Sequence, residues 1–509
     1  MKTRSKMIML VCLLMVMSTS LLGCGKNDNK PENANPDATN AGGTGGEKLP
    51  PMDISFLTYA NSPFSQTDSA DAIKQIEEYT NTKLNLQIVP STGGEEKLNV
   101  TIASGDMPTL LATVVKNSTI INAARAGAFW EIGDLIKDYP YFSEINSVVY
   151  DNISIDGKVY GLPRTRPLIR PVLAYRTDIL KELGMKEPET PDELFEVLTA
   201  VKQKYPDMTP LMDIDGNADW TLYPFLFQSF GTPNKWEVNA AGEFIPYFES
   251  PGYTEAMKYH KKLYDAGLLN EDFAVAKQSD KDQRVRSGNA FAFIQAADSV
   301  NDERASIRSG SKNENADLDF IVSLKDASGK MTVRALPGHN GMLLFPKSKI
   351  KDEAQLKRVL DFVSALHDPE MANLLEYGIE GKNYELKDGA PVLLDRQDYL
   401  DRITNLKTLL SRLNFNTTVA EKTELQKKGD SVSADYIDFA ISNPADPLYS
   451  DTFAQKGSQL ERDLIDTMIR YSMGVTDEAG LKKALQDWYS KGGTQIAKEF
   501  AEQLAKQKQ

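Results

Sequence analysis

The chain has 509 residues, a formal net charge of −14 and a hydrophobic share of 41%. This negative balance disfavours nucleic acid or anionic headgroups as partners bound through a broad electrostatic field. Only three histidines (His260, His339, His367) and two cysteines are present, so a zinc site, a histidine-based nucleophile and thiol redox chemistry are not expected.

The first 23 residues have the form of an export signal. Three basic residues precede an apolar run over Met7–Met17, which is too short for the ~20 residues that span a bilayer. The following Leu-Leu-Gly-Cys resembles the lipobox of bacterial lipoproteins, in which a peptidase cuts before the cysteine and the sulfur receives a diacylglycerol. We therefore predict a signal peptide over 1–23 and lipidation of Cys24. The alternative is an ordinary secretory signal followed by a stray thiol.

Residues 24–50 are rich in Asn, Gly, Pro, Asp and Lys and almost devoid of apolar side chains. Such a segment cannot offset its own ordering entropy, so we predict a flexible tether. A lipid anchor with a tether predicts a globular part that works at the extracytoplasmic face of a cell membrane. Removal of the signal peptide takes the net charge to −17.

The first predicted elements follow an α/β pattern. Apolar residues alternate over 53–60, recur near helical spacing over 68–82 and alternate again over 84–89. This order of strand, helix and strand predicts a βαβ unit with parallel strands and a right-handed crossover. A helix from 95 and a strand over 109–115 continue the pattern, which predicts an α/β lobe.

The pattern begins again at Pro171, where a strand leads into a helix. Thr190 is a predicted helix cap, with Pro191 at the first helical position and Glu193 completing a capping box. A short apolar strand over 289–295 and a largely helical final 80 residues follow. Because the chain after the tether is longer than one hydrophobic core usually accommodates, we expect at least two lobes.

Several phrases resemble one known family, the family-1 extracellular solute-binding lipoproteins of carbohydrate ABC transporters. Within this family the chain resembles the LipO-like lipoproteins of Gram-positive bacteria, which are related to alginate-binding proteins. The phrases occur in the order of the family: ASGDMPTLL (103–111), DGKVYGLPR (156–164), TPDELFEVL (190–198), EAQLKRVLDFVSALHDPE (353–370) and EYGIEGKNY (376–384).

The resemblance implies an α/β, two-lobe periplasmic-binding-protein-like fold of type II, with a helical carboxyl-terminal extension. It implies a monomer that closes on a carbohydrate and delivers this ligand to the membrane subunits of an ABC permease. Binding of nucleic acid is not expected. The expected amino-terminal lobe comprises 51–170 and 286–336, and the expected carboxyl-terminal lobe comprises 171–285 and 337–509. We place the crossings near Arg166–Pro171, Arg284–Gly288 and Pro337–Gly341.

Sugar binding requires flat apolar faces for pyranose rings, and tryptophans supply them. Trp220 and Trp236 flank an aromatic-rich stretch with Gly and Pro breaks, so both are candidates for stacking. The alternative for either residue is packing in the core. Trp130 and Trp488 are expected to be structural.

Polar candidates lie mainly in loops, since open α/β sheets bind ligands at the carboxyl ends of their strands. Arg164 and Arg166, in a cluster with Arg170 and Arg176, suit the bidentate binding of a uronate carboxylate. The alternative is that these arginines pair with acidic side chains of the protein. The further candidates are Asn61, Ser62, Asp106 (alternatively a turn residue at a helix end), His339, Asn340, Glu380 and Tyr384.

No cofactor is expected, and calcium is disfavoured. Alginate-binding relatives carry a calcium loop after the helix that matches 190–204, but this position holds KYPDMTPL here. The downstream DIDGNAD has oxygen-bearing side chains at alternate positions, yet Gly216 is at the fourth place and Pro224 at the twelfth.

The sequence thus predicts a solute-binding lipoprotein of an ABC importer, and not an enzyme. The predicted ligand is an oligosaccharide, and an acidic oligosaccharide is one form that it could take. Motifs such as G-x-S-x-G, H-E-x-x-H and the P-loop do not occur. Two alternatives remain: a membrane-anchored glycoside hydrolase, and a surface adhesin or sensor accessory protein without a small-molecule ligand.

Overall fold

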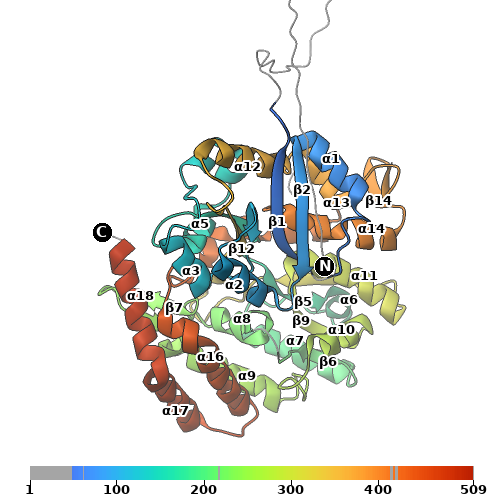
Figure 1. Cartoon of the computed structure of the whole chain (residues 1–509). Helices are drawn as coiled ribbons and strands as arrows, with labels where there is room; N and C mark the ends of the chain where they lie inside the picture. The colour runs from blue at the N-terminus through green and yellow to red at the C-terminus, as the bar shows by residue number, and fades with distance from the viewer. Residues whose placement is uncertain (1–48, 61, 216–217, 413–416, 419–421, 508–509) are drawn as a thin grey trace, which may run out of the picture. The chain divides into compact units, whose positions relative to one another are not determined.

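The computed structural model describes residues 49–60, 62–215, 218–412, 417–418 and 422–507. From Pro51 onward the chain forms one unit that contains two main β-sheets, each covered by helices on both faces (Figure 1). The predicted signal peptide, most of the predicted tether, and Cys24 lie outside the described residues. None of the helices described is long and apolar enough to cross a bilayer.

The first sheet has the strand order β2-β1-β3-β12-β4. Its strands are β1 (Met52–Ala60), β2 (Thr82–Pro90), β3 (Leu110–Ala112), β4 (Gly161–Thr165) and β12 (His339–Leu344). β12 is antiparallel to both of its neighbours, and the other strands run parallel to one another. The amino end of β12 therefore lies at the same edge as the carboxyl ends of β1, β3 and β4.

The predicted βαβ unit is confirmed. Ile54 pairs with Leu84 in a parallel register, and α1 (Ala70–Thr80) connects the two strands. Alternate residues of β1 enter different cores, Phe56 on one face and Leu57 on the other. Both faces are thus buried, as is usual for a mainly parallel sheet. α1, α12 (Glu353–Ala365) and α13 (Pro369–Tyr377) cover one face, and α2 (Gly94–Ser104) and α3 (Ser118–Arg125) cover the other.

The second sheet has the order β10-β5-β9-β6. Its strands are β5 (Pro171–Arg176), β6 (Thr209–Met212), β9 (Ala290–Ala296) and β10 (Leu318–Ile321), and β5 is antiparallel to both of its neighbours. One face is covered by α6 (Thr177–Glu182), α7 (Pro191–Lys204), α8 (Leu222–Ser229) and α9 (Pro251–Asp265). The other is covered by α10 (Gln278–Arg286), α11 (Val300–Ser311) and α15 (Glu424–Asp435).

The predicted start of α7 is confirmed in detail. The Thr190 side chain accepts a hydrogen bond from the backbone N–H of Glu193, and the Glu193 carboxylate accepts one from the Thr190 N–H. Pro191 occupies the first turn, where its missing N–H has no consequence.

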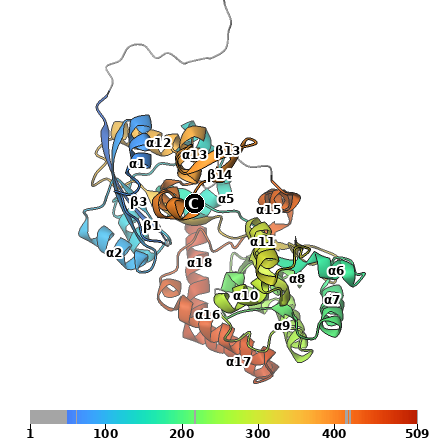
Figure 2. The ribbon, with the colours of Figure 1, turned by 90° about the vertical axis from the view of Figure 1, so that its right-hand side faces the viewer.

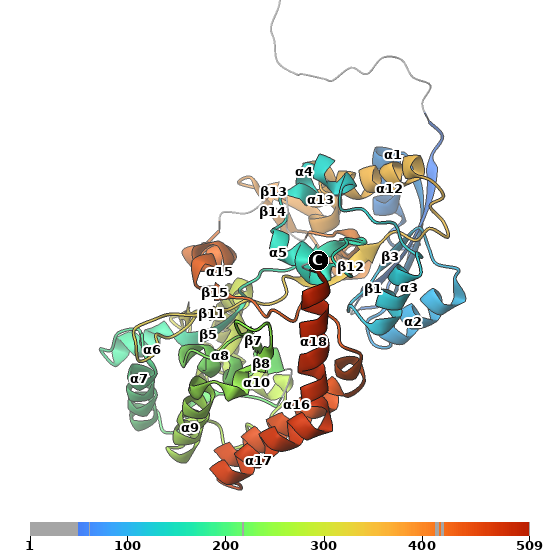
Figure 3. The ribbon, with the colours of Figure 1, turned by 90° about the vertical axis from the view of Figure 1, so that its left-hand side faces the viewer.

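The chain ends in three helices that pack on the second sheet's region, as Figures 2 and 3 show: α16 (Asp451–Ser472), α17 (Glu478–Trp488) and α18 (Thr494–Gln507). This confirms the predicted helical carboxyl-terminal part. The remaining helices are α4 (Pro140–Ser143), α5 (Ser147–Ile153) and α14 (Arg396–Arg402). The remaining strands are β7 (Trp236–Val238), β8 (Phe244–Pro246), β11 (Val333–Arg334), β13 (Tyr384–Lys387), β14 (Ala390–Leu393) and β15 (Ala440–Ile441). Short 3₁₀ turns, among them η2 (Ala218–Trp220) and η5 (Thr404–Leu409), and a π-helical turn, η7 (Tyr489–Gly493), complete the described elements.

The strand pairing differs from the predicted boundaries. β9 and β10, within 286–336, pair in the second sheet, whereas β12, within 337–509, pairs in the first. The predicted crossing at Arg284–Gly288 is wrong, because α10 and β9 on its two sides both belong to the second sheet's region. The chain passes between the sheets at 166–170, again at 335–338, and a third time between η5 and α15.

Candidate functional site

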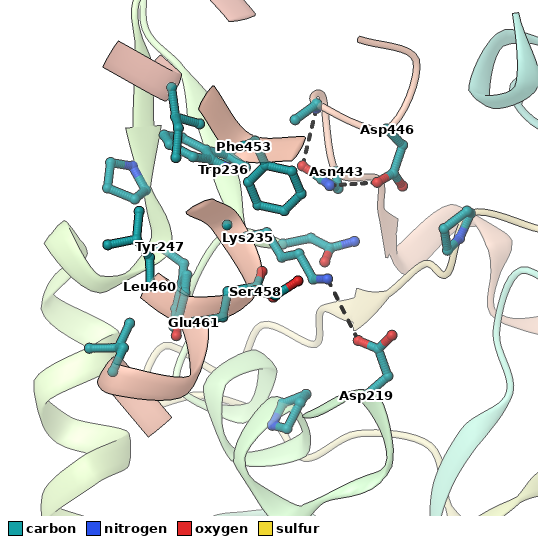
Figure 4. A pocket seen from close by; sticks show the side chains of 18 of the residues that line it. Asp219, Lys235, Trp236, Tyr247, Asn443, Asp446, Phe453, Ser458, Leu460 and Glu461 are labelled. Carbon is teal, nitrogen blue, oxygen red and sulfur yellow. Dashed lines mark hydrogen bonds and ion pairs between the residues drawn. The ribbon is translucent and has the colours of Figure 1, made fainter. Parts of the chain in front are cut away.

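A cavity of about 1090 Å³ lies where the edges of the two sheets meet α16. Its first wall comes from the first sheet's region and includes Glu95, Asn99, the segment 115–119, Asn152 and His339. Its second wall comes from Asp219, the segment 232–236, Arg334, the segment 443–450 and one face of α16 (Figure 4). Since 115–119 follows β3 and His339 begins β12, the first wall stands at the carboxyl edge of the sheet, where α/β folds usually bind ligands.

Lys116 closes the cavity between the two walls. Its ammonium donates hydrogen bonds to the carbonyls of Asn152 at 2.8 Å, Ser154 at 3.3 Å and Asp446 at 3.0 Å. These bonds use all three N–H groups. Burial lowers the pKa of Lys116 to about 8.

Asn117 and one ring nitrogen of His339 also form hydrogen bonds within the protein. Asn117 caps α3 by accepting a bond from the Ile120 N–H, and its amide donates to Glu95 and Asn99. His339 Nδ1 accepts from the Gly341 N–H, so the ring proton is on Nε2. Burial, with a contribution from nearby Lys116, lowers the pKa of His339 to about 4, and the ring is neutral at pH 7.

The second wall carries a concentration of charge around Lys235. The Arg334 guanidinium donates to the Asp219 carboxylate at 2.6 Å, and Lys235 Nζ lies 3.9 Å from the same carboxylate. Burial alone would raise the pKa of Asp219, but Lys235 and Arg334 together lower it. Figure 4 shows the Lys235 ammonium pointing towards Asp219.

Two further carboxylates lie within electrostatic reach of Lys235. Burial raises the pKa of Asp446 and of Glu461, and Lys235 opposes both shifts. The Asp446 carboxylate accepts a hydrogen bond from the Asn443 amide at 2.6 Å. Glu461 lines the cavity from α16. Lys235 is thus the cation shared by the three carboxylates of this wall.

α16 presents Ala454, Ser458 and Glu461 to the cavity, which helical spacing places on one stripe. Phe453 also lines the cavity and is 39% exposed. Its ring lies on Gly457, where an added Cβ would be 2.6 Å from the Phe453 Cδ2. An exposed ring held in this way is a flat apolar surface of the kind on which a pyranose stacks.

Of the predicted site residues, the structure brings Trp236 and His339 to the cavity. Trp236 is only 8% exposed and packs in an aromatic cluster with Phe244, Trp488 and Phe500 at centroid distances of 5.6–6.0 Å. The core-packing alternative therefore describes Trp236 better than stacking on a ligand does. Trp220 does not line the cavity, and its ring lies 5.4 Å below the Arg170 guanidinium.

The arginine cluster divides into two pairs. Arg170 pairs with Asp298 at 3.2 Å and Arg176 with Asp178 at 2.6 Å, so the acid-pairing alternative holds for these two. Arg164 is buried, and burial together with Arg166 lowers the pKa of Arg164 to about 10. Arg166 donates to the carbonyl of its neighbour Thr165. Neither Arg164 nor Arg166 lines the cavity.

The remaining candidates lie outside the cavity lining. Ser62 donates to Asn405 at 2.9 Å, and the exposed Asp106 pairs with Lys349 at 2.9 Å. Asn340 is exposed beside His339. Glu380 and Tyr384 are bridged to each other next to the β13–β14 hairpin, with Tyr384 buried. Asn61 lies outside the described residues.

Three of the oxygen-bearing residues of 213–219 are described, and each has a different partner, whereas Asn217 lies outside the described residues. Asp213 is buried and accepts from the Leu222 N–H, Asp215 pairs with Lys277 at 2.6 Å, and Asp219 pairs with Arg334. Within the described ranges no group of three or more His, Cys, Asp or Glu side chains is placed to hold a metal ion.

Sequence reasoning considered Asp219 only as part of a possible calcium loop, and it missed Lys235, Glu461 and Phe453. One signal in the sequence could have indicated the last of these. Gly457 stands inside a helical pattern, where glycine is unfavourable and often has a packing reason. The other three acquire their role from segments that are far apart in the sequence.

Comparisons with known proteins agree with this geometry. The chain belongs to the family of bacterial extracellular solute-binding proteins, whose family model matches residues 71–377. It is 32% identical to the polygalacturonan/rhamnogalacturonan-binding protein YtcQ of Bacillus subtilis over 97% of this chain and 98% of the relative. It is also 32% identical to lipoprotein LipO of the same organism, over 88% of this chain and 91% of LipO.

Solved structures confirm the predicted two-lobe, periplasmic-binding-protein-like fold. The N-glycan transport solute-binding protein NgtS of Streptococcus pneumoniae matches with a TM-score of 0.66 and 17% identity, over 90% of this chain and 99% of NgtS. The alginate-binding protein AlgQ2 without calcium matches with a TM-score of 0.61 and 16% identity, over 89% and 98%. The family is one of solute-binding proteins, in agreement with the prediction that the chain is not an enzyme.

Proposed function

We propose that the protein binds an oligosaccharide in the cavity between the two sheets and delivers it, unaltered, to an ABC permease in the membrane. The observation that carries this proposal is a cavity of about 1090 Å³ in which an exposed aromatic ring, Phe453, faces charged and amide groups. Flat apolar surface and convergent hydrogen-bonding groups are the two requirements of sugar binding.

The size of the cavity favours a ligand of several sugar units. Small-molecule pockets usually enclose ~300–1000 Å³, and the volume of this cavity is slightly above that range. Relatives of similar length are named for polygalacturonan, rhamnogalacturonan, fructooligosaccharide and N-glycan ligands. These ligands are all carbohydrates of more than one unit, which supports an oligosaccharide over a single sugar.

We further propose that Cys24 carries a lipid and that 24–50 tethers the globular part to the extracytoplasmic face of the membrane. The support is the lipobox-like sequence and the 32% identity to a protein named as a lipoprotein. A tether keeps the local concentration of the protein near the permease high, so that repeated encounters need no long diffusion.

The two sheets are proposed to belong to two lobes that rotate about the connectors at 166–170 and 335–338. The first connector runs from β4 to β5, and the second runs from β11, which packs in the second sheet's region, to β12. Changes in a few backbone dihedrals in these connectors would widen or narrow the cavity.

Isothermal titration of the full chain against a panel of neutral and uronate-containing oligosaccharides tests the proposal. We expect binding of at least one panel member, a decrease in the radius of gyration on binding in X-ray scattering, and no new reducing ends after prolonged incubation. Product formation would support the glycoside hydrolase alternative. The absence of binding across the panel would overturn the oligosaccharide assignment and support an adhesin or accessory role.

A further inference from the structure

We propose that Lys235 is the residue that selects an acidic sugar unit, binding the carboxylate of a uronate within the oligosaccharide. This inference rests on the proposed function and names the chemical class of its ligand. It is carried by three features of Lys235: how its backbone is held, how its ammonium is placed, and what the other cations of the cavity are doing.

The backbone around Lys235 is fixed from both sides. The buried Asn234 amide donates to the carbonyls of Ala335 at 2.7 Å and Ile441 at 2.9 Å, and Trp236 is anchored in the aromatic cluster. The Lys235 carbonyl accepts a bond from the Tyr247 N–H at 2.8 Å. Lys235 itself has a φ of +60°, a left-handed conformation that a lysine adopts only when its surroundings impose it.

The consequence is that the Lys235 side chain is directed into the cavity. It is 46% exposed although both adjacent residues are buried. Its ammonium makes no hydrogen bond with any residue that the structure describes, and its nearest ion pair, with Asp219, is at 3.9 Å. Lys235 therefore has N–H groups available for a ligand.

The other cations that line the cavity are occupied or peripheral. Lys116 donates to three carbonyls, and Arg334 is held by the Asp219 carboxylate and carbonyl. Arg462 is exposed on α16 and donates to Gln459 on the same helix at 3.2 Å. Among the cavity's described cations, Lys235 is thus the one placed inside with its donors uncommitted.

The surrounding charges make the position next to the Lys235 ammonium the favourable one for an anionic ligand. Asp219, Asp446 and Glu461 all interact electrostatically with Lys235, so a carboxylate entering elsewhere on this wall would meet like charges. Next to Lys235 the same carboxylate gains a charge-assisted hydrogen bond. The arginines at 164 and 166, which the sequence suggested for this role, do not line the cavity.

The test compares an oligogalacturonide with its fully methyl-esterified form, which has the same rings but no negative charge. Titrations use the full chain and the variants Lys235→Met, Lys235→Arg and, as a matched control, Lys349→Met, which removes an exposed lysine outside the cavity. Thermal unfolding of each variant checks that the fold is retained.

We expect Lys235→Met to weaken oligogalacturonide binding by ~10–100-fold, as loss of a hydrogen bond to a charged group does, and to change ester binding by less than ~3-fold. We expect Lys235→Arg to retain most of the affinity for the oligogalacturonide, and Lys349→Met to leave the affinity for both ligands unchanged. The salt dependence of oligogalacturonide binding decreases in Lys235→Met.

An equal loss for acid and ester in Lys235→Met would show a structural role and overturn the inference. So would unchanged binding of the acid, or a wild-type protein that binds only neutral oligosaccharides. In each of these cases the proposed function stands. If the wild-type chain binds no oligosaccharide of any kind, the proposed function fails, and the inference fails with it.

Discussion

The two walls of the cavity differ in how far their polar groups are already satisfied. On the first wall Lys116 and Asn117 make their hydrogen bonds within the protein, and His339 does so through Nδ1. On the second wall Lys235 and Phe453 have surface that nothing in the described chain covers. The first wall is thus a rigid frame, and the second holds the groups that are available to a ligand.

This difference shows how one cavity combines side chains that are fixed by the protein with side chains that are available to a ligand. A buried polar network that is fully satisfied fixes its own geometry, because each unmade bond would be costly. The binding groups can then be few, provided that the structure around them is held. The comparison predicts that changes to the first wall reduce stability, whereas changes to the second reduce affinity.

The largest effect is expected at Gly341, at the edge where the first wall meets the sheet. Gly341 has a φ of +78°, and an added Cβ would lie 2.0 Å from the Thr113 carbonyl oxygen. Gly341→Ala therefore forces β12 away from β3 and lowers the free energy of unfolding by ~3 kcal/mol or more, measured by urea denaturation. The matched control is Gly329→Ala, with a φ of +80° and no atom within 4 Å, for which ~1 kcal/mol is expected. Equal losses would contradict the role assigned to this close approach.

The next effect concerns His367, which is buried in the first sheet's region. Its Nδ1 donates to the Val363 carbonyl, and Nε2 accepts from the Arg412 N–H, so a second ring proton would meet a donor. Burial is the main cause that lowers the pKa of His367 to about 4 from 6.5.

Between pH 6.5 and 4 the unfolded chain binds this proton and the folded chain does not, so stability is lost as the pH falls through this window. The full loss is ~3 kcal/mol at 1.36 kcal/mol per pKa unit. Urea denaturation at several pH values should show a smaller pH dependence in His367→Gln than in wild type. An NMR titration that gave His367 an ordinary pKa near 6.5 would refute this prediction.

On the second wall, Gly457→Ala should affect affinity but not stability. The new Cβ displaces the Phe453 ring. We expect oligosaccharide binding to weaken by ~2–10-fold, about as much as in Phe453→Ala, since an aromatic contact is worth ~0.5–1.5 kcal/mol. Alanine is the better helix former by ~1 kcal/mol, so the melting temperature should not fall. Calorimetry and thermal unfolding measure the two effects, and a stable Gly457→Ala with unchanged affinity would count against Phe453 as a stacking surface.

The smallest effect is expected at Asp106. Its ion pair with Lys349 is exposed, so Asp106→Asn should change stability by less than ~1 kcal/mol and oligosaccharide affinity by less than ~2-fold. A large loss of affinity would show that the loop of Asp106 belongs to the binding site after all, and it would weaken the contrast between the two walls.

Local patterns in the sequence were sufficient for much of the fold. The alternation in 53–60 and 84–89 predicted β1 and β2, and the Thr190–Glu193 pair predicted the start of α7. In these cases the information lies within a few neighbouring residues. The lobe assignment of β9 was wrong because a short apolar strand fits either sheet, and only the pairing with β5 decides.

The site was less accessible to sequence reasoning for a related reason. Trp236 was suggested by its type, but its ring is used by Phe244 and Trp488, which come from other segments. Lys235 directly precedes it and was not noticed, since a left-handed φ at a lysine is imposed by tertiary contacts. Such side chains acquire their role only when distant parts of the chain meet.

The ammonium of Lys116 has a consequence for loading and unloading. It joins the carbonyls of Asn152 and Ser154 to that of Asp446, which precedes α16. If the segment of Asp446 moves away from that of Asn152 and Ser154, the Lys116–Asp446 hydrogen bond breaks and water can reach the ammonium. Burial of this cation is unfavourable, so its hydration offsets much of the free energy lost with the bond. Breaking the Lys116–Asp446 hydrogen bond therefore costs little net free energy. A weak contact of this kind suits a binding protein that takes up and releases its ligand many times.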